Sequence, residues 1–233
     1  MQKLKVSRII DALVEYYKRG GLCKTVLQRS LLFDAYNRLR YGREAPLYCE
    51  QVWVDPKNVK QHIYKHGGMG PTSGLVIGEW PPMIDCLTEL VCENTVVKSC
   101  IDHWKNGVDW QDTDDYKSKL KYLTDNGSVW NECRNEKDLL KSYDNLDSVF
   151  TQVKKDGRLK TRKELNSNSF REKGTFSIHI DPEGSLWLGA GGYHRFAIAL
   201  VLELEMVPAR IGLVHKDAIP LLSTFRNLEA ERM

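Results

Sequence analysis

The stretch Gly189-Ala190-Gly191-Gly192-Tyr193-His194-Arg195-Phe196, near the C-terminus, decides how this chain is expected to fold. Apolar and polar residues alternate over 176–180, a period-two pattern that predicts a strand with one buried face. Residues 181–184 read Asp-Pro-Glu-Gly, which a type I turn favours, so a second strand is expected over 185–188. Residues 196–204 are almost entirely apolar and predict a buried helix.

The junction between this hairpin and this helix is suited to an anion. The first N–H groups of a helix lack intrahelical partners and carry partial positive charge. Glycines let a bulky anion approach the backbone, and His194 and Arg195 add side-chain donors. Arg195 could hold phosphate through two bonds, while His194 could donate a bond or carry a proton. Alternatively, the glycines only cap a turn and Arg195 is a surface charge.

Several segments carry a family resemblance. Residues 191–197, Gly-Gly-Tyr-His-Arg-Phe-Ala, resemble the helix-opening motif of the ParB/sulfiredoxin superfamily, where strand, glycine turn, His-Arg and an Ala-rich helix occur together. Residues 149–159 are similar to the short helix ending in Gly that precedes the hairpin in this family. Residues 206–211 are similar to its closing strand, and residues 48–59 resemble its opening strand. The resemblance is good over about residues 146–215.

In that superfamily the glycine and His-Arg motif binds nucleotide phosphates. The resemblance therefore implies that Gly191, Gly192, Tyr193, His194 and Arg195 bind a nucleotide, ATP or another nucleoside triphosphate, with the Mg²⁺ that triphosphates carry. Tyr193 stands where sulfiredoxins have their cysteine nucleophile, so repair of cysteine sulfinic acid is not expected. The arginine-rich motif and helix-turn-helix domain of chromosome-partitioning members are missing as well. Small-molecule kinases of the superfamily stay compatible, which implies a phosphotransferase with an unidentified acceptor.

Composition sets the outer bounds. Hydrophobic residues make up 42% and charged residues 28% of the sequence, which is ordinary for a soluble globular protein. The net charge of +3 is too small to indicate nucleic acid by itself. No apolar run is long enough to span a membrane. Six cysteines without a Cys-x-x-Cys pair favour free thiols in a reducing, cytoplasmic compartment, and no metal site is expected.

Residues 1–45 are predicted to form a basic pair of helices. One runs over about 9–17 and ends at Gly20-Gly21, and the second runs from about Lys24 to Leu39. The second is expected to bury its apolar residues Val26, Leu27, Leu31, Leu32 and Tyr36. The basic residues favour an anionic partner, nucleic acid or lipid headgroups, or alternatively form the solvated face of a hairpin packed on the main domain.

The main domain is expected over residues 46–233. After a strand at residues 52–54, residues 62–71 are Gly-rich and predict a long loop that could close over the nucleotide. Its basic residues, Lys60, Lys65 and one of His62 and His66, could then reach phosphate. Residues 75–82 predict a short strand, and Glu79 at its end is a candidate base or metal-bridging carboxylate, or else an exposed loop residue.

Residues 84–145 are predicted to form a helical insert. A helical region begins at Ile84 and ends near Trp104, and residues 103–113 form an elbow that either selects the acceptor or anchors the insert through Trp104 and Trp110. Further helices are expected over 116–123, 136–153 and 221–233. Lys160 and Arg162 lie on the approach to the hairpin and are secondary candidates for phosphate contacts, or else part of a solvated basic loop.

Together these patterns predict an α/β (α+β) domain with a small mixed sheet, an N-terminal helical extension and a helical insert. The favoured function is binding of a nucleotide, ATP in the first place, with phosphoryl transfer in which the amides, His194 and Arg195 stabilise charge. His194 and Glu79 are the candidates for a catalytic role. The alternative is a nucleic-acid-processing module without kinase activity, in which the same site holds a DNA phosphate. The sequence does not specify the oligomeric state.

Overall fold

The structure is a computed structural model that describes residues 26–65, 74–81, 86–127 and 133–227. Within these residues the helices are α2 (Val26–Tyr41), α3 (Thr95–Asn106), α4 (Asp114–Asn126), α5 (Glu136–Asp156), α6 (Arg162–Leu165), α7 (Tyr193–Val201) and α8 (Leu222–Asn227). The strands are β1 (Gln51–Val54), β2 (Gln61–Lys65), β3 (Gly74–Val76), β4 (Cys86–Leu90), β5 (Ser177–Ile180), β6 (Leu186–Leu188) and β7 (Val207–His215).

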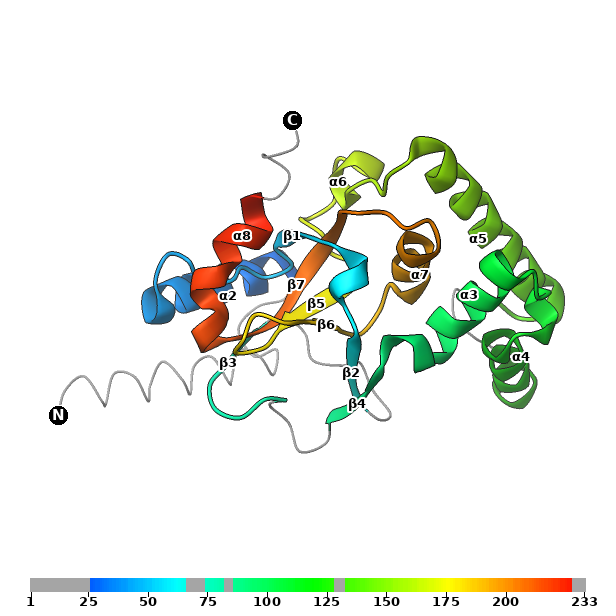
Figure 1. Ribbon diagram of the computed structural model, residues 1–233, viewed down its shortest axis with the longest axis horizontal. Coiled ribbons are helices and arrows are strands. Elements are labelled where there is room, and N and C mark those ends of the chain that lie inside the picture. The colour runs from blue at the N-terminus through cyan, green and yellow to red at the C-terminus, as the bar shows by residue number, and fades with distance from the viewer. Residues whose placement is uncertain (1–25, 66–73, 82–85, 128–132, 228–233) are drawn as a thin grey trace.

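The described strands form one mixed sheet in the order β1-β7-β5-β6-β2-β4, and β3 pairs with the far end of β7. Strand β7 is parallel to β5 and to β3 and antiparallel to β1, while β2 is parallel to β6 and antiparallel to β4. The α/β class and the mixed sheet expected from the sequence are therefore confirmed. Figure 1 shows α7 beside the sheet with α3, α4 and α5 around it, and α2 and α8 at the other end of the molecule.

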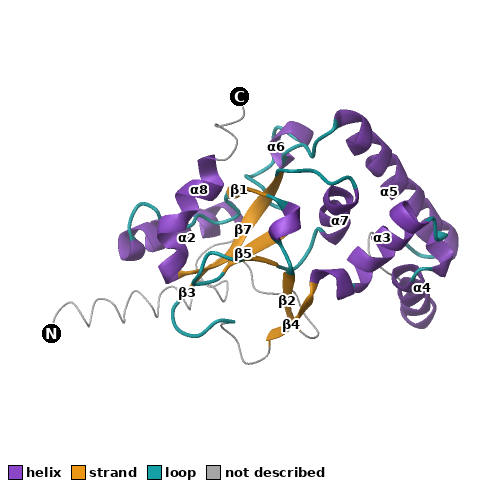
Figure 2. Ribbon diagram, viewed as in Figure 1, coloured by secondary structure: helices purple, strands orange, loops and turns teal. Residues whose placement is uncertain are grey.

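The strand register brings distant residues to one end of the sheet. Leu188, the last residue of β6, pairs with Ile178 of β5 and with His62 of β2. His62 in turn pairs with Glu89 of β4, and Arg210 pairs with Ser177 at the start of β5. The glycine stretch leaves β6 at this same end and leads directly into α7, as the path in Figure 2 shows.

The insert is held in place by local capping and by aromatic packing. Asn94, Thr113 and Asn135 accept backbone N–H bonds at the starts of α3, α4 and α5, and a left-handed glycine ends each helix. Trp104 and Trp110 both donate their indole N–H to Asp147 of α5, at 2.7 Å and 3.1 Å. The two tryptophans therefore join α3 and the elbow to α5, which is the anchoring role.

Two predicted elements are wrong in kind. Residues 62–65 belong to β2 instead of opening a loop, and residues 86–90 form β4 instead of starting a helix. Both segments are strands because they pair with each other over five residues, and such tertiary pairing overrides local pattern. The rest of the predicted loop, residues 66–71, lies outside the described residues.

Strand β5 also differs from its prediction. All four of its residues are buried, so both faces are covered instead of one. The turn that follows is as predicted, because Gly184 N–H donates to the Asp181 carbonyl at 3.1 Å. Strand β7 and helices α4, α5 and α7 lie where the sequence places them, within a few residues at their ends. Helix α8 begins where predicted, and residues 228–233 of the predicted terminal helix lie outside the described residues.

Helix α2 matches the predicted second N-terminal helix but presents a different face. Over residues 30–41, where burial is described, the buried residues are Ser30, Asp34 and Asn37, all of them polar. Leu31 and Leu32 are 57% and 53% exposed, so their predicted burial is wrong, while the side chains of Val26 and Leu27 lie outside the described part of the helix. The helix attaches to the domain through hydrogen bonds, which the apolar pattern cannot reveal. The predicted helix at residues 9–17 lies outside the described residues.

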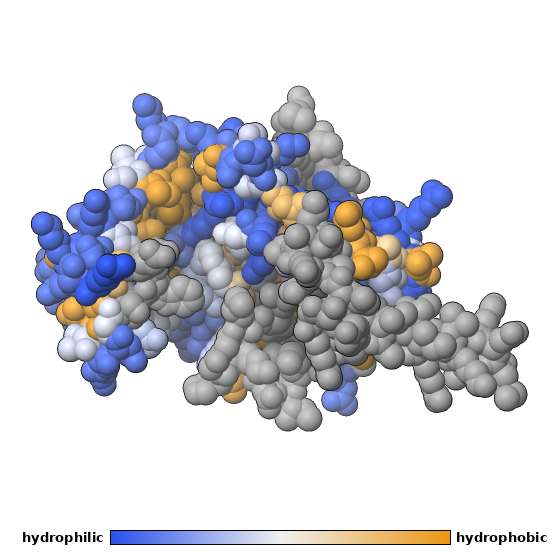
Figure 3. All heavy atoms as spheres, turned by 180° about the vertical axis from the view of Figure 1, so that it is seen from behind, coloured by the Kyte–Doolittle hydropathy of each residue, from blue (hydrophilic) through white to orange (hydrophobic). Residues whose placement is uncertain are grey.

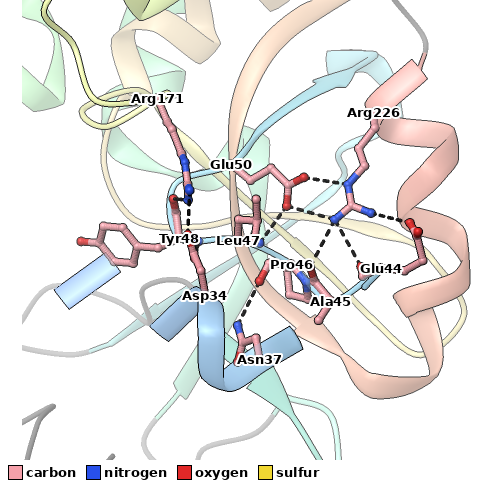
Figure 4. A network of polar contacts seen from close by, with 10 residues as sticks. All are labelled: Asp34, Asn37, Glu44, Ala45, Pro46, Leu47, Tyr48, Glu50, Arg171 and Arg226. Carbon is pink, nitrogen blue, oxygen red and sulfur yellow. Dashed lines mark hydrogen bonds and ion pairs between the residues drawn. The ribbon is translucent and has the colours of Figure 1, made fainter. Parts of the chain in front are cut away.

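Figure 4 shows this polar attachment. Asp34 accepts a bond from the Tyr48 N–H at 2.7 Å and from Arg171 Nη2 at 2.6 Å. Arg226 of α8 forms two bonds with the Glu50 carboxylate, at 2.7 Å and 3.1 Å, and a third with Glu44 at 2.9 Å. These charge-assisted bonds tie α2 and α8 to the segment before β1, which makes α2 part of the same packed unit.

The surface is mainly hydrophilic on the face opposite to that of Figure 1. Figure 3 shows polar side chains over most of the described part of this face, with apolar side chains in separate groups. None of the described helices is long and apolar enough to cross a bilayer.

Candidate functional site

The glycine turn, defined as Gly189–Gly192, connects β6 to α7 in a conformation that side chains disfavour. Gly191 and Gly192 have φ angles of +85° and +67°, in the left-handed region. A Cβ at Gly192 would lie 2.4 Å from the backbone N of Phe176, so the turn packs directly against the residue that precedes β5. Gly192 is the N-cap of α7, and no described side chain caps the helix there. The first N–H groups of α7 are therefore left for another acceptor.

The three polar residues that open α7 point to three different neighbours. Successive helical side chains are rotated by about 100°, so consecutive residues cannot share a face. Tyr193 reaches β2, His194 reaches α4, and Arg195 reaches the loop before α6. The structure thus places Tyr193, His194 and Arg195 at the helix start as expected, but their side chains do not converge on the glycine turn.

His194 faces a buried carboxylate of the insert. Its Nε2 lies 3.7 Å from Asp115 Oδ2, an ion-pair distance and not a hydrogen bond. Asp115 is 3% exposed and accepts shorter bonds from Lys119 Nζ at 2.7 Å and from Tyr143 Oη at 2.8 Å. Burial alone would raise the pKa of Asp115, but His194, Lys119 and Tyr143 together outweigh it and lower the pKa to about 2. His194 therefore sits beside a permanent negative charge.

Arg195 lies with the two secondary candidates, Lys160 and Arg162. Its Nη2 donates to the Lys160 carbonyl, and the Arg162 N–H donates to Glu172 Oε1 at 2.8 Å. Burial lowers the pKa of Arg195 and raises the pKa of Glu172, and the opposite charges of the two groups oppose both shifts. The phosphate role expected of Lys160 and Arg162 stays a prediction. The Lys160 ammonium itself pairs with Asp156 at 2.8 Å.

Arg210 of β7 contacts the glycine turn with its guanidinium group. Its Nη2 donates to the Ala190 carbonyl at 3.1 Å. Its Nε is buried and has no hydrogen-bond partner among the described residues. A guanidinium has five N–H donors, so most of its capacity remains for a ligand. Nothing in the sequence pattern distinguished Arg210 from other basic residues, because its position depends on the register of β7 with β5.

His179 of β5 contributes a second unpaired donor beside the turn. The ring fits there because position 189 is glycine, where a Cβ would lie 2.3 Å from its Nε2. Its Nδ1 accepts the Leu213 N–H at 2.7 Å, so the proton must be on Nε2. This Nε2 is buried without a partner in the described part of the chain. Burial and the nearby Arg210 charge lower the pKa of His179 to about 3, so the ring is neutral.

Tyr193, His62 and Glu89 form a hydrogen-bonded chain that we call the Tyr193–His62–Glu89 triad. His62 Nδ1 lies 2.8 Å from Glu89 Oε1, and His62 Nε2 lies 3.1 Å from Tyr193 Oη. His62 is 1% exposed, and burial lowers its pKa while Glu89 opposes the shift. Burial raises the pKa of Tyr193. The sequence placed His62 in a loop and did not select Glu89, because their pairing depends on the register of β2 with β4.

Glu79 is not part of this constellation. It is exposed and follows β3, which pairs with the His215 end of β7. That end lies opposite to the glycine turn, and β7 and β5 separate β3 from β6 in the sheet. The structure therefore does not bring Glu79 to the site. Among the described residues, no three His, Cys, Asp or Glu side chains are grouped to hold a metal ion.

Comparisons of the chain with protein-family models, with curated proteins and with solved structures found no match.

Proposed function

We propose that the glycine turn binds the phosphate groups of a nucleoside triphosphate, ATP in the first place, and that the protein transfers a phosphoryl group to an acceptor. One observation carries the proposal. Arg210 Nε and His179 Nε2 are buried donors without partners among the described residues, and both side chains lie against a turn whose helix amides are uncapped. Buried polar groups are normally paired, so these donors favour an anionic ligand.

The donors suit phosphate in charge as well as in number. The N-terminus of α7 carries about half a positive charge, and Arg210 adds a full one. His179 adds a neutral N–H, since burial and the Arg210 charge lower its pKa to about 3. Donors fixed by the backbone and by buried side chains need no reorganisation when charge shifts during phosphoryl transfer. The resemblance to the ParB/sulfiredoxin superfamily supports the same ligand class.

In this scheme Mg²⁺ arrives bound to the phosphates of the triphosphate and has no binding site of its own among the described residues. The described residues offer no group of three metal-ligating side chains. Mg²⁺ commonly keeps several waters and binds through substrate phosphates, so a dedicated protein site is not required. In this scheme the ion neutralises phosphate charge, and the chain itself supplies the amides, Arg210 and His179.

Two arginines compete for the role of phosphate ligand, and mutation distinguishes them. The resemblance implies Arg195 together with His194, whose Nε and Nε2 atoms are also buried without hydrogen-bond partners among the described residues. The bond to the Ala190 carbonyl of the glycine turn favours Arg210 instead. We expect Arg210→Met to weaken MgATP binding by about 10- to 100-fold, as lost charge-assisted bonds do. Arg195→Met should have a smaller effect, and Arg38→Met, which removes an exposed charge from α2, should have none.

Isothermal titration of wild type and the three variants with MgATP, AMP and inorganic phosphate gives the measurement. A larger loss of MgATP affinity in Arg195→Met than in Arg210→Met would mean that Arg195, the residue that the resemblance implies, is the phosphate ligand. Equal affinity in all four proteins would reject the site. Thermal unfolding with each ligand serves as a second readout, since a ligand of the folded state raises its stability.

The nucleic-acid alternative has one observation in its favour. Helix α2 and the turn after it expose Arg38, Arg40 and Arg43. If DNA is the ligand, its affinity should fall steeply with salt, and removing these charges should reduce the slope. Phosphate release from ATP without DNA would support the phosphotransferase instead.

A further inference from the structure

The protonation pattern of the Tyr193–His62–Glu89 triad follows from its partners. A carboxylate accepts hydrogen bonds, so Glu89 Oε1 accepts one from the His62 Nδ1–H across 2.8 Å. The lone pair of His62 is then on Nε2 and accepts the Tyr193 O–H across 3.1 Å. A hydroxyl bonded to an imidazole that a carboxylate orients is the arrangement of an activated nucleophile and its base.

The imidazole is held firmly in this orientation. The ring of Tyr64 stacks on it with centroids 5.2 Å apart, and the ring of Tyr193 meets it edge-on at 5.3 Å. Asn94 donates to the same Glu89 oxygen at 3.3 Å, so the carboxylate is fixed from a second side. The three members come from α7, β2 and β4, and the strand pairing of His62 with Glu89 sets their approach.

The position of the hydroxyl separates this triad from an ordinary buried network. Tyr193 is the first residue of α7, directly after the glycine turn. Tyr193 therefore stands directly beside the helix amides where phosphate is expected. Gly191 is exposed and Tyr193 is only partly buried, so this position is open to the surroundings.

We propose that Tyr193 is a nucleophile, activated by His62 and Glu89, which accepts the terminal phosphoryl group of a nucleoside triphosphate. The inference rests on the proposed function for its phosphate donor. In the first step a bond forms between Tyr193 Oη and phosphorus, and the bond from phosphorus to the bridging oxygen breaks. The electron pair leaves on the nucleoside diphosphate, and the tyrosine proton moves to His62 Nε2. Glu89 stabilises the resulting imidazolium.

The second step reverses the roles. An acceptor hydroxyl attacks the phosphotyrosine, the Tyr193 oxygen leaves and takes the proton back from His62, and the acceptor proton passes to solvent. The sum is one triphosphate and one alcohol converted to one diphosphate, one phosphate ester and one proton. Because burial raises the pKa of Tyr193 and lowers that of His62, both are neutral at rest, so the proton moves only as the new bond forms.

Chemical labelling tests the nucleophile without any nucleotide. Phenylmethylsulfonyl fluoride is an uncharged electrophile, and mass spectrometry locates its adducts. We expect Tyr193 to react about 100-fold faster than the exposed Tyr122, the size of effect that a positioned base supplies. His62→Gln and Glu89→Gln should each reduce the Tyr193 rate by at least about 10-fold. Asp114→Asn, which removes an exposed carboxylate of α4 that has no part in the triad, should leave the rate unchanged.

A second arm uses MgATP labelled in the γ-phosphate. Acid-stable label should appear on Tyr193 and should be lost in Tyr193→Phe, while ATP affinity stays within about threefold because the variant keeps the ring. Selective sulfonylation that depends on His62, without ATP binding, would support the activated nucleophile and reject the nucleotide site. Normal ATP binding with Tyr193 no more reactive than Tyr122 would overturn the inference and leave the phosphate site standing.

Discussion

Replacing Asp115 with Asn tests how much the buried carboxylate that His194 faces contributes to the stability of the fold. The carboxylate is 3% exposed and is bonded to Lys119 and Tyr143. Its pKa of about 2, against an ordinary 3.8, means that folding favours the ionised form. At about 1.4 kcal/mol per pKa unit, the charge contributes about 2 kcal/mol to the free energy of unfolding.

The pH dependence gives the prediction a sign. Because the folded pKa lies below the unfolded value, this stabilisation is fully present above about pH 4 and is lost as the pH falls toward about 2. Asp115→Asn should therefore lower the free energy of unfolding by about 2 kcal/mol near pH 7, a Tm decrease of roughly 4–8 °C. The difference between wild type and variant should shrink toward about pH 2 as the wild-type carboxylate protonates.

Urea unfolding at several pH values measures the difference. Asp114→Asn is the matched control, since it removes a charge from the same first turn of α4 at a side chain 69% exposed. The control should change the free energy of unfolding by less than about 0.5 kcal/mol. An Asp115→Asn variant as stable as the control near pH 7, or a difference that grows in acid, would refute the reasoning.

Three further outcomes follow from the same structure. Gly192→Ala should lower the free energy of unfolding by about 2–5 kcal/mol, because it combines left-handed backbone strain with a clash against the Phe176 backbone. Gly191→Ala has the strain without the clash and should cost only about 1–2 kcal/mol, and urea unfolding of the two variants measures the difference. The rate at which phenylmethylsulfonyl fluoride labels Tyr193 should rise with pH as His62 loses its proton, and it should be constant above pH 6.5, since burial lowers the pKa of His62 below its ordinary value of 6.5. A rate that still rises up to about pH 10 would mean that His62 is not the base. Arg226→Met should cost about 2 kcal/mol through its lost bonds to two carboxylates; an unchanged urea midpoint would make the attachment of α8 unimportant.

Patterns that are local in the sequence predicted structure well. The alternation at residues 176–180, the turn at 181–184 and the apolar run after the glycines each contain their own signal. The α/β class followed from them. Strands β2 and β4 were missed because neither alternates clearly, and only their pairing with each other makes them strands.

The sequence predicted the position of the candidate site but not which side chains contact one another there. The glycine turn and its helix were found from the motif. The partners of the residues that open α7 were not, because they come from far away in the chain. The Tyr193 hydroxyl bonds to His62, 131 residues away, and Arg195 bonds to Lys160, 35 residues away. Adjacent residues on a helix diverge by about 100°, so a His-Arg pair in sequence does not guarantee a His-Arg pair at a ligand.

The amides of the glycine turn themselves give the most direct test of phosphate binding. In protein labelled with ¹⁵N-glycine, addition of MgATP should shift the amide signals of Gly191 and Gly192 strongly downfield as they bond to phosphate oxygens. The signals of Gly107 and Gly157, which end α3 and α5, should stay in place. Unmoved signals for Gly191 and Gly192 at saturating MgATP would contradict the account.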